Sequence, residues 1–313
     1  MAKRSAARTL VALCLLALAA PARGATLTLV TKDALTDPTT QNTLDNSASV
    51  TLPATLSSRF LPLQGQSDSS NGGNANASAS GSANFGLLTA KASQSRTGAS
   101  PYRESAAEAE AAFKDSVTIS GGSGTGSYQA LFKLDGVANA LLSSFTDDPA
   151  TMDPSFAHAN YTATITLGST VLEWTGQFIS SSISGNSSVL ASTLKLNGAV
   201  VADTLPDGLP GTFTTPTVSF LYGTPFELSA RLKVSATGDD NDTSRFSASA
   251  DLSGTFQWLG MTGLAPGDVV TSQSGASWAA AMVIPEPGTL ALLSAGLIGL
   301  AVFPRVSHSA GNA

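Results

Sequence analysis

"FELSARLKVSA", residues 226–236, alternates apolar and polar side chains without a break. Its apolar positions are Phe226, Leu228, Ala230, Leu232, Val234 and Ala236. Because successive side chains of a β-strand point to opposite faces, this alternation predicts a strand with one buried and one wet face. Antiparallel sheets commonly keep one face in water, so the strand is expected to belong to such a sheet.

The same alternation recurs in four other segments. They are residues 127–134, 161–167, 172–178 and 246–258. Two-residue turn signals accompany them, because Gly168-Ser169 and Asn197-Gly198 favour the positive φ that tight hairpins require. The chain is therefore predicted to be all-β, an antiparallel β-sandwich that is jelly-roll-like or an open barrel.

Two segments interrupt this pattern. Residues 66–84 contain no large apolar side chain, so they are predicted to form a disordered loop that cannot offset the cost of ordering its backbone. Residues 104–115 have a helix-forming composition, but the alternation of Phe113, Val117 and Ile119 favours a strand over a short helix. Residues 25–284 are interpreted as one extracellular domain, with two smaller domains as the alternative.

The N-terminal residues 1–24 are predicted to be a secretory signal peptide. Basic residues come first, an apolar run follows over residues 10–20, and small residues precede the expected cleavage bond. The run is too short to cross a hydrocarbon core of about 30 Å. The residues that define the predicted cleavage are Ala22, Gly24 and Ala25.

Cysteine content and charge restrict the chemistry of the mature chain. The only cysteine, Cys14, lies inside the predicted signal, so no disulfide, thiol nucleophile or cysteine metal site is expected after cleavage. Removal of residues 1–24, which hold four basic and no acidic residues, takes the formal net charge from −6 to −10. This acidic balance argues against nucleic acid as a partner, since binding a phosphate backbone needs clustered Lys and Arg.

The C-terminal residues "PEPGTLALLSAGLIGLAVFPR", 285–305, form a second apolar segment. Pro285 and Pro287 hold the chain extended around Glu286, and the charge-free run 289–303 is predicted to be a helix. Fifteen helical residues span only about 22 Å, which is short of a bilayer core of about 30 Å.

This tail resembles the PEP-CTERM sorting signal of Gram-negative bacteria. The resemblance rests on Pro285, Glu286 and Pro287, the apolar run and the basic residue Arg305, where the family pattern has a cluster of arginines. It implies that an exosortase, a membrane-embedded transpeptidase-like enzyme, recognises the tail and cuts near the motif, with the helix as a transient anchor. It also implies delivery through the inner membrane and periplasm to the cell surface or the extracellular matrix of a biofilm.

The preceding region resembles the variable extracellular domains that often come before this signal. The resemblance lies in the strand and turn pattern of residues 113–136, 222–238 and 244–261. It implies no catalytic residue.

Few residues outside the tail suggest chemistry. Beyond the predicted signal the chain has only His158 and His308, too few for a histidine zinc site, and His158 is interpreted as a loop residue although Asp153 and Ser155 lie near it. The acidic turn that holds Asp239, Asp240 and Asp242 is a weak calcium candidate, with a solvated turn favoured. No cofactor is predicted.

These observations favour a non-enzymatic structural protein of the cell envelope or biofilm matrix. A carbohydrate-binding module of the exopolysaccharide matrix is the first alternative. It would need an exposed row of aromatic side chains, and Trp278 is the tryptophan that lies outside the alternating segments. Trp174 and Trp258 fall on apolar strand faces and are predicted core residues. A glycan hydrolase that uses paired carboxylates is the second alternative. The expected partners are an exosortase-type enzyme and an exopolysaccharide.

Overall fold

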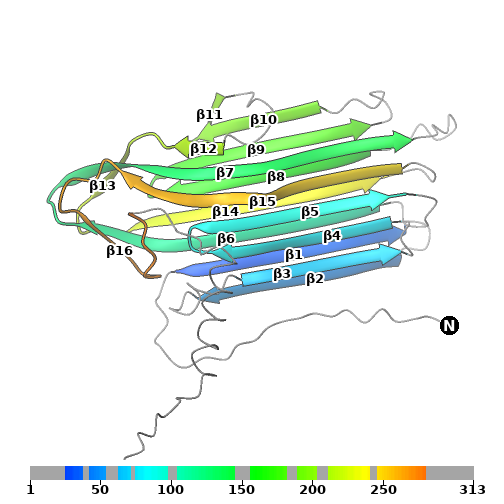
Figure 1. Cartoon of the computed structure of the whole chain (residues 1–313), viewed down its shortest axis with the longest axis horizontal. Helices are drawn as coiled ribbons and strands as arrows, with labels where there is room; N and C mark the ends of the chain where they lie inside the picture. Colours follow the sequence, from blue (N-terminus) through cyan, green and yellow to red (C-terminus); the bar gives the residue numbers. More distant parts are fainter. Residues whose placement is uncertain are drawn as a thin grey trace, which may run out of the picture.

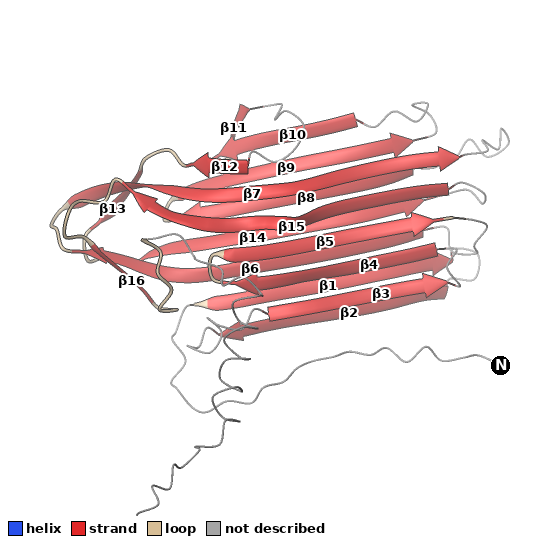
Figure 2. Ribbon diagram, viewed as in Figure 1, coloured by secondary structure: helices blue, strands red, loops and turns tan. Residues whose placement is uncertain are grey.

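The computed structural model describes residues 25–37, 42–53, 63–71, 75–97, 104–144, 156–181, 189–202, 211–239 and 245–279. In this part of the chain every ordered element is a strand, and every strand pair is antiparallel (Figure 2). The strands form two layers that lie face to face along the long axis of the molecule (Figure 1). The prediction of an all-β antiparallel sandwich is confirmed.

The larger layer is a nine-stranded sheet. Its order is β11 (Ala199–Ala202), β10 (Val189–Leu196), β9 (Thr170–Ser181), β8 (Phe156–Leu167), β14 (Phe226–Asp239), β6 (Glu104–Ser120), β1 (Thr26–Asp37) and β2 (Asn42–Pro53). The ninth strand, β16 (Val269–Ser272), pairs with the last four residues of β6, beyond the point where β1 stops pairing.

The smaller layer is a seven-stranded sheet. Its order is β12 (Gly211–Thr214), β7 (Thr125–Ser144), β15 (Arg245–Thr262), β5 (Leu87–Arg96), β4 (Ala75–Asn84) and β3 (Leu63–Asn71). The seventh strand, β13 (Val218–Leu221), also pairs with β7, at the start of that strand.

The predicted hairpin turns are confirmed. Gly168 has φ +61° in the turn between β8 and β9, and Asn197 and Gly198 have φ +50° and +83° between β10 and β11. Residues 104–115 belong to β6, so the strand interpretation of this segment is also confirmed.

The core changes character along the strands. At one end it is aromatic, and Phe113 stacks on Trp278 with ring centroids 5.2 Å apart. At the other end it consists mainly of alanine. The buried alanines of that end are Ala75, Ala77, Ala79, Ala90, Ala92, Ala107, Ala109, Ala138, Ala140, Ala157, Ala159, Ala236, Ala248 and Ala250.

Small side chains bring the two sheets unusually close together. Cα atoms of β4 and β5 approach those of β6 within 8 Å, whereas packed sheets usually lie about 10 Å apart. Gly81 of β4 lies close to the facing sheet, because a Cβ there would lie 3.0 Å from Cδ1 of Leu29 on β1.

The prediction of a disordered loop over residues 66–84 is wrong. Residues 66–71 belong to β3 and residues 75–84 form β4, which pairs with β5 along its whole length. The physical reason is the narrow gap between the sheets. Alanine fills that gap at alternate positions, so the strand buries a complete face without any large apolar residue.

Candidate functional site

The last described segment of the chain is held by a buried carboxylate. Asp115 lies on β6 with 1% of its surface exposed. Its Oδ1 accepts hydrogen bonds from the backbone N–H of Ser116, at 2.8 Å, and of Ser274, at 3.1 Å. Its Oδ2 accepts from Ser274 Oγ, at 2.5 Å, and from Trp278 Nε1, at 2.7 Å. We call Asp115, Ser274 and Trp278 the C-terminal clasp.

Trp278 also closes the aromatic end of the core. Besides stacking on Phe113, it meets Phe85 and Trp258 edge to face, with centroid distances of 6.4 and 5.4 Å. Trp258 Nε1 donates to the carbonyl oxygen of Trp278 at 2.8 Å. The chain is thus fixed to the sandwich up to Ala279, whose carbonyl oxygen accepts from the backbone N–H of Met261.

Burial of Trp278 overturns its interpretation as a sugar-stacking residue. All three tryptophans have no exposed surface, so the prediction of Trp174 and Trp258 as core residues is confirmed and extends to Trp278. The residues before Trp278 do not alternate, which is why the sequence pattern placed it outside the core.

Asp115→Asn is expected to lower the free energy of unfolding by about 2 kcal/mol, because an amide would direct donors towards the donors of the clasp. Urea denaturation of the mature chain measures this change. The control is Asp251→Asn, which alters a more exposed partner of Lys91 and should cost less than about 1 kcal/mol. Equal losses in both variants would contradict the role assigned to the clasp.

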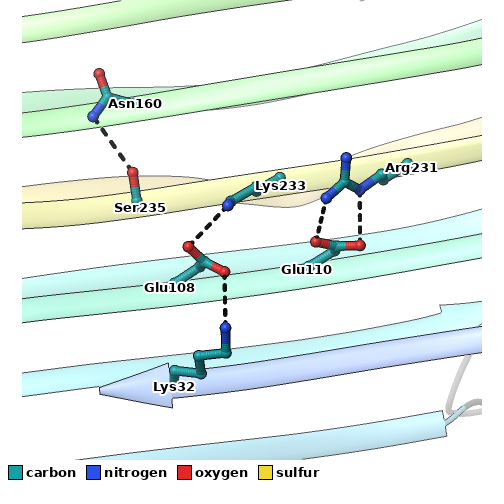
Figure 3. A network of polar contacts seen from close by, with 7 residues as sticks. All are labelled: Lys32, Glu108, Glu110, Asn160, Arg231, Lys233 and Ser235. Carbon is teal, nitrogen blue, oxygen red and sulfur yellow. Dashed lines mark hydrogen bonds and ion pairs between the residues drawn. The ribbon is translucent and has the colours of Figure 1, made fainter. Parts of the chain in front are cut away.

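The outer face of the nine-stranded sheet carries paired charges (Figure 3). Arg231 donates from Nε and Nη2 to the two oxygens of Glu110, at 2.7 and 2.6 Å. This pairing holds the pKa of Arg231 above its usual value. Glu108 lies between Lys233, at 2.9 Å, and Lys32, at 3.6 Å. Each carboxylate in this network is therefore paired with a cation on a neighbouring strand.

The outer face of the seven-stranded sheet carries many small hydroxyls, together with the ion pairs Lys91–Asp251 and Lys133–Asp135. We call its hydroxyl-bearing part the hydroxyl face, and it consists of Ser78, Ser80, Ser82, Thr89, Ser93, Ser95, Ser247 and Ser249 on β4, β5 and β15. Ser78 and Ser93 share a hydrogen bond of 2.8 Å between their Oγ atoms. A shallow hollow of about 250 Å³ lies over this face and is lined mainly by serines of β4, β5 and β15.

A second shallow hollow, of about 330 Å³, lies on the nine-stranded sheet where β8, β9 and β10 meet. It contains Gly176, which pairs with Tyr161 on the neighbouring strand. A Cβ on Gly176 would lie 2.2 Å from the ring of Tyr161, so only glycine fits beside that ring. Tyr161 is itself 3% exposed, and burial raises the pKa of its hydroxyl. The ring therefore belongs to the core and offers no platform for a sugar.

His158 lies on β8 and contacts the ring of Phe156, with centroids 4.7 Å apart. Partial burial lowers the pKa of the imidazole. It is a strand residue, so its interpretation as a loop histidine is wrong, and Asp153 and Ser155 lie outside the described residues.

The structure describes only part of the predicted sites. Asp239 ends β14 opposite Phe156, while Asp240 and Asp242 lie outside the described residues. Within the described ranges no three His, Cys, Asp or Glu side chains gather in a way that could hold a metal ion.

Most of the predicted terminal segments lie outside the residues that the structure describes. The signal peptide, the tail helix over 289–303 and the residues Ala22, Gly24, Pro285, Glu286, Pro287 and Arg305 all lie there. Ala25, the predicted first residue of the mature chain, is described and is buried. The described part of the chain has no helix that is long and apolar enough to cross a membrane.

Comparison with known families identifies the tail. Residues 283–306 match the family model described as the PEP-CTERM protein-sorting motif. No curated protein and no solved structure matches the chain. The chain therefore carries a PEP-CTERM sorting motif that begins four residues after Ala279. The motif implies a secreted protein directed to the cell surface and processed by an exosortase, a membrane enzyme.

Proposed function

We propose that the chain is a non-enzymatic structural protein of the cell envelope or biofilm matrix, with the sandwich as its displayed body. The observation that carries this proposal is the nature of its two outer faces. One bears a network of paired charges, the other bears small hydroxyls with two ion pairs, and the hollows on both are shallow. Faces of this kind can make repeated weak contacts with hydrated polymers. Binding of a small substrate typically uses an enclosed pocket instead.

Processing of the tail tests the delivery step. Intact mass measurement of the surface fraction is expected to find a chain that starts at Ala25 and lacks the apolar run 289–303. Replacing residues 285–287 by alanines should keep the full tail and leave the chain in the membrane fraction. Surface protein that retains residues 285–313 would contradict the proposed delivery.

The structural role has a separate test. Deletion of the gene is expected to weaken the cohesion of the matrix, measured by rheology, and the wild-type chain should restore it. Glu108→Gln combined with Glu110→Gln should restore it only in part, because this variant removes the paired charges through which the face contacts the polymer. Release of reducing sugar from extracted exopolysaccharide by the wild-type chain, absent in this variant, would instead favour a glycan hydrolase.

Contact with exopolysaccharide is a second candidate function, which the hydroxyl face favours. Its hydroxyl side chains are short and regularly spaced around the Lys91–Asp251 pair, and they can donate and accept hydrogen bonds to sugars. Ser93→Glu with Ser249→Glu is expected to reduce retention of the mature chain on extracted exopolysaccharide at least tenfold. The control Thr164→Glu, on the outer face of the other sheet, should leave retention unchanged. Equal retention of both variants would exclude this face.

A further inference from the structure

The tail leaves the sandwich at a fixed point. The clasp holds the chain to Ala279, and Met261, which hydrogen-bonds Ala279, pairs with Ala130 of β7. Residues 280–288 then connect this point to the apolar run at 289–303. Nine fully extended residues span at most about 30 Å.

The length of the connection between Ala279 and the apolar run limits which end of the sandwich can face a membrane that holds the tail. Along β7, Thr125 lies five residues from Ala130 towards one end, and Ser144 lies fourteen residues away towards the other. At about 3.3 Å per residue these separations are about 17 Å and 46 Å. The connection can therefore pass the Thr125 end with length to spare, whereas it is too short to pass the Ser144 end.

The surface at the Thr125 end combines exposed apolar side chains with very little charge, whereas the similarly exposed Val137 and Leu141 lie on the strand surface of β7 beside Lys91, Asp251 and Ser247. We call the surface at the Thr125 end the tip, and it consists of the turns 121–124, 222–224 and 263–268 with the flanking Leu221 and Val269, seen at the left of Figure 1 around β13 and β16. Leu221 and Val269 are 53% and 54% exposed, although both are large apolar side chains.

The tip is also almost without charge. In the three segments that build it, residues 116–132, 211–226 and 259–279, Asp268 is the only charged residue. Its carboxylate accepts from Tyr222 Oη, at 3.1 Å, and from the backbone N–H of Ala265, at 2.8 Å. Exposed apolar side chains beside a tyrosine, with little charge around them, suit the interface of a lipid bilayer.

We propose that the tip rests on the interface of a zwitterionic bilayer while the tail is inserted. This proposal rests on the proposed anchoring through the tail. The short connection selects the tip, and its apolar, charge-free surface fits the lipid. The Ser144 end of the sandwich then points away from the membrane, towards the outside.

Site-specific fluorescence tests the proposal. The mature chain has no cysteine, so Ser123→Cys in the tip and Ser247→Cys near the Ser144 end each give one labelling site. Residues 25–313 carrying an environment-sensitive dye are reconstituted into phosphatidylcholine vesicles that contain spin-labelled lipid. The dye at position 123 is expected to shift its emission to the blue and to be quenched, and the dye at position 247 to behave as in water.

Flotation of the vesicles separates the possible outcomes. If the chain does not float with the vesicles, the proposed anchoring fails and the tip proposal fails with it. If the chain floats but the dye at position 123 stays in water, only the tip proposal is overturned. Leu221→Asp with Val269→Asp should float normally and lose the quenching at position 123. Unchanged quenching in this variant would likewise overturn the role of the tip.

Discussion

Trp278→Ala is expected to lower the free energy of unfolding by about 4 kcal/mol. The side chain is fully buried between Phe85, Phe113 and Trp258, so its removal leaves a cavity at the aromatic end of the core. It also deprives the buried carboxylate of Asp115 of a donor. Urea denaturation of the mature chain, followed by circular dichroism, measures the loss.

A conservative variant separates packing from hydrogen bonding. Trp278→Phe keeps an aromatic ring but removes the indole N–H, so it should cost about 2 kcal/mol. Its effect should not add to that of Asp115→Asn, because both changes break the same hydrogen bond. A loss below about 1 kcal/mol in Trp278→Ala would show that the segment is not held as the structure describes.

The clasp matters for function because it lies directly before the sorting motif. Ala279, the last described residue, is separated from residue 283, where the motif begins, by only three residues. The folded body and the tail are therefore almost continuous. In Trp278→Ala the segment 272–279 is expected to detach and lengthen the connection, so proteolysis there should become faster even under conditions in which the sheets remain folded.

Strand alternation predicted the sheets well where the apolar residues are large. β8 and β14 were both predicted from sequence, and they pair over twelve residues with their apolar positions on the same face. The rule failed for β4, because a face of alanine has too little apolar surface to stand out from serine and asparagine. Only the distance to the facing sheet, which no local pattern encodes, makes that face sufficient.

The sequence predicted the sorting motif of the tail, but it did not predict the buried C-terminal clasp. Pro285 to Pro287 with the apolar run identified the tail, as the family match confirms. A signal for the clasp was also present in the sequence, since Asp115 occupies an inward position between Phe113 and Val117 of β6. A carboxylate at a buried position needs hydrogen-bond donors. No local pattern indicates that these donors come from residues 274 and 278, more than 150 positions away.

Ala109→Leu is expected to cost about 3 kcal/mol, because a larger side chain at the alanine end would force the sheets apart. Ala109 has no exposed surface and lies on β6, whose Cα atoms come within 8 Å of those of β4 and β5. The matched control is Ala112→Leu on the outward face of the same strand, which should change stability by less than about 0.5 kcal/mol. If Ala109→Leu were equally neutral, the gap between the sheets would have room for a leucine, and the close approach that orders β4 would lose its explanation.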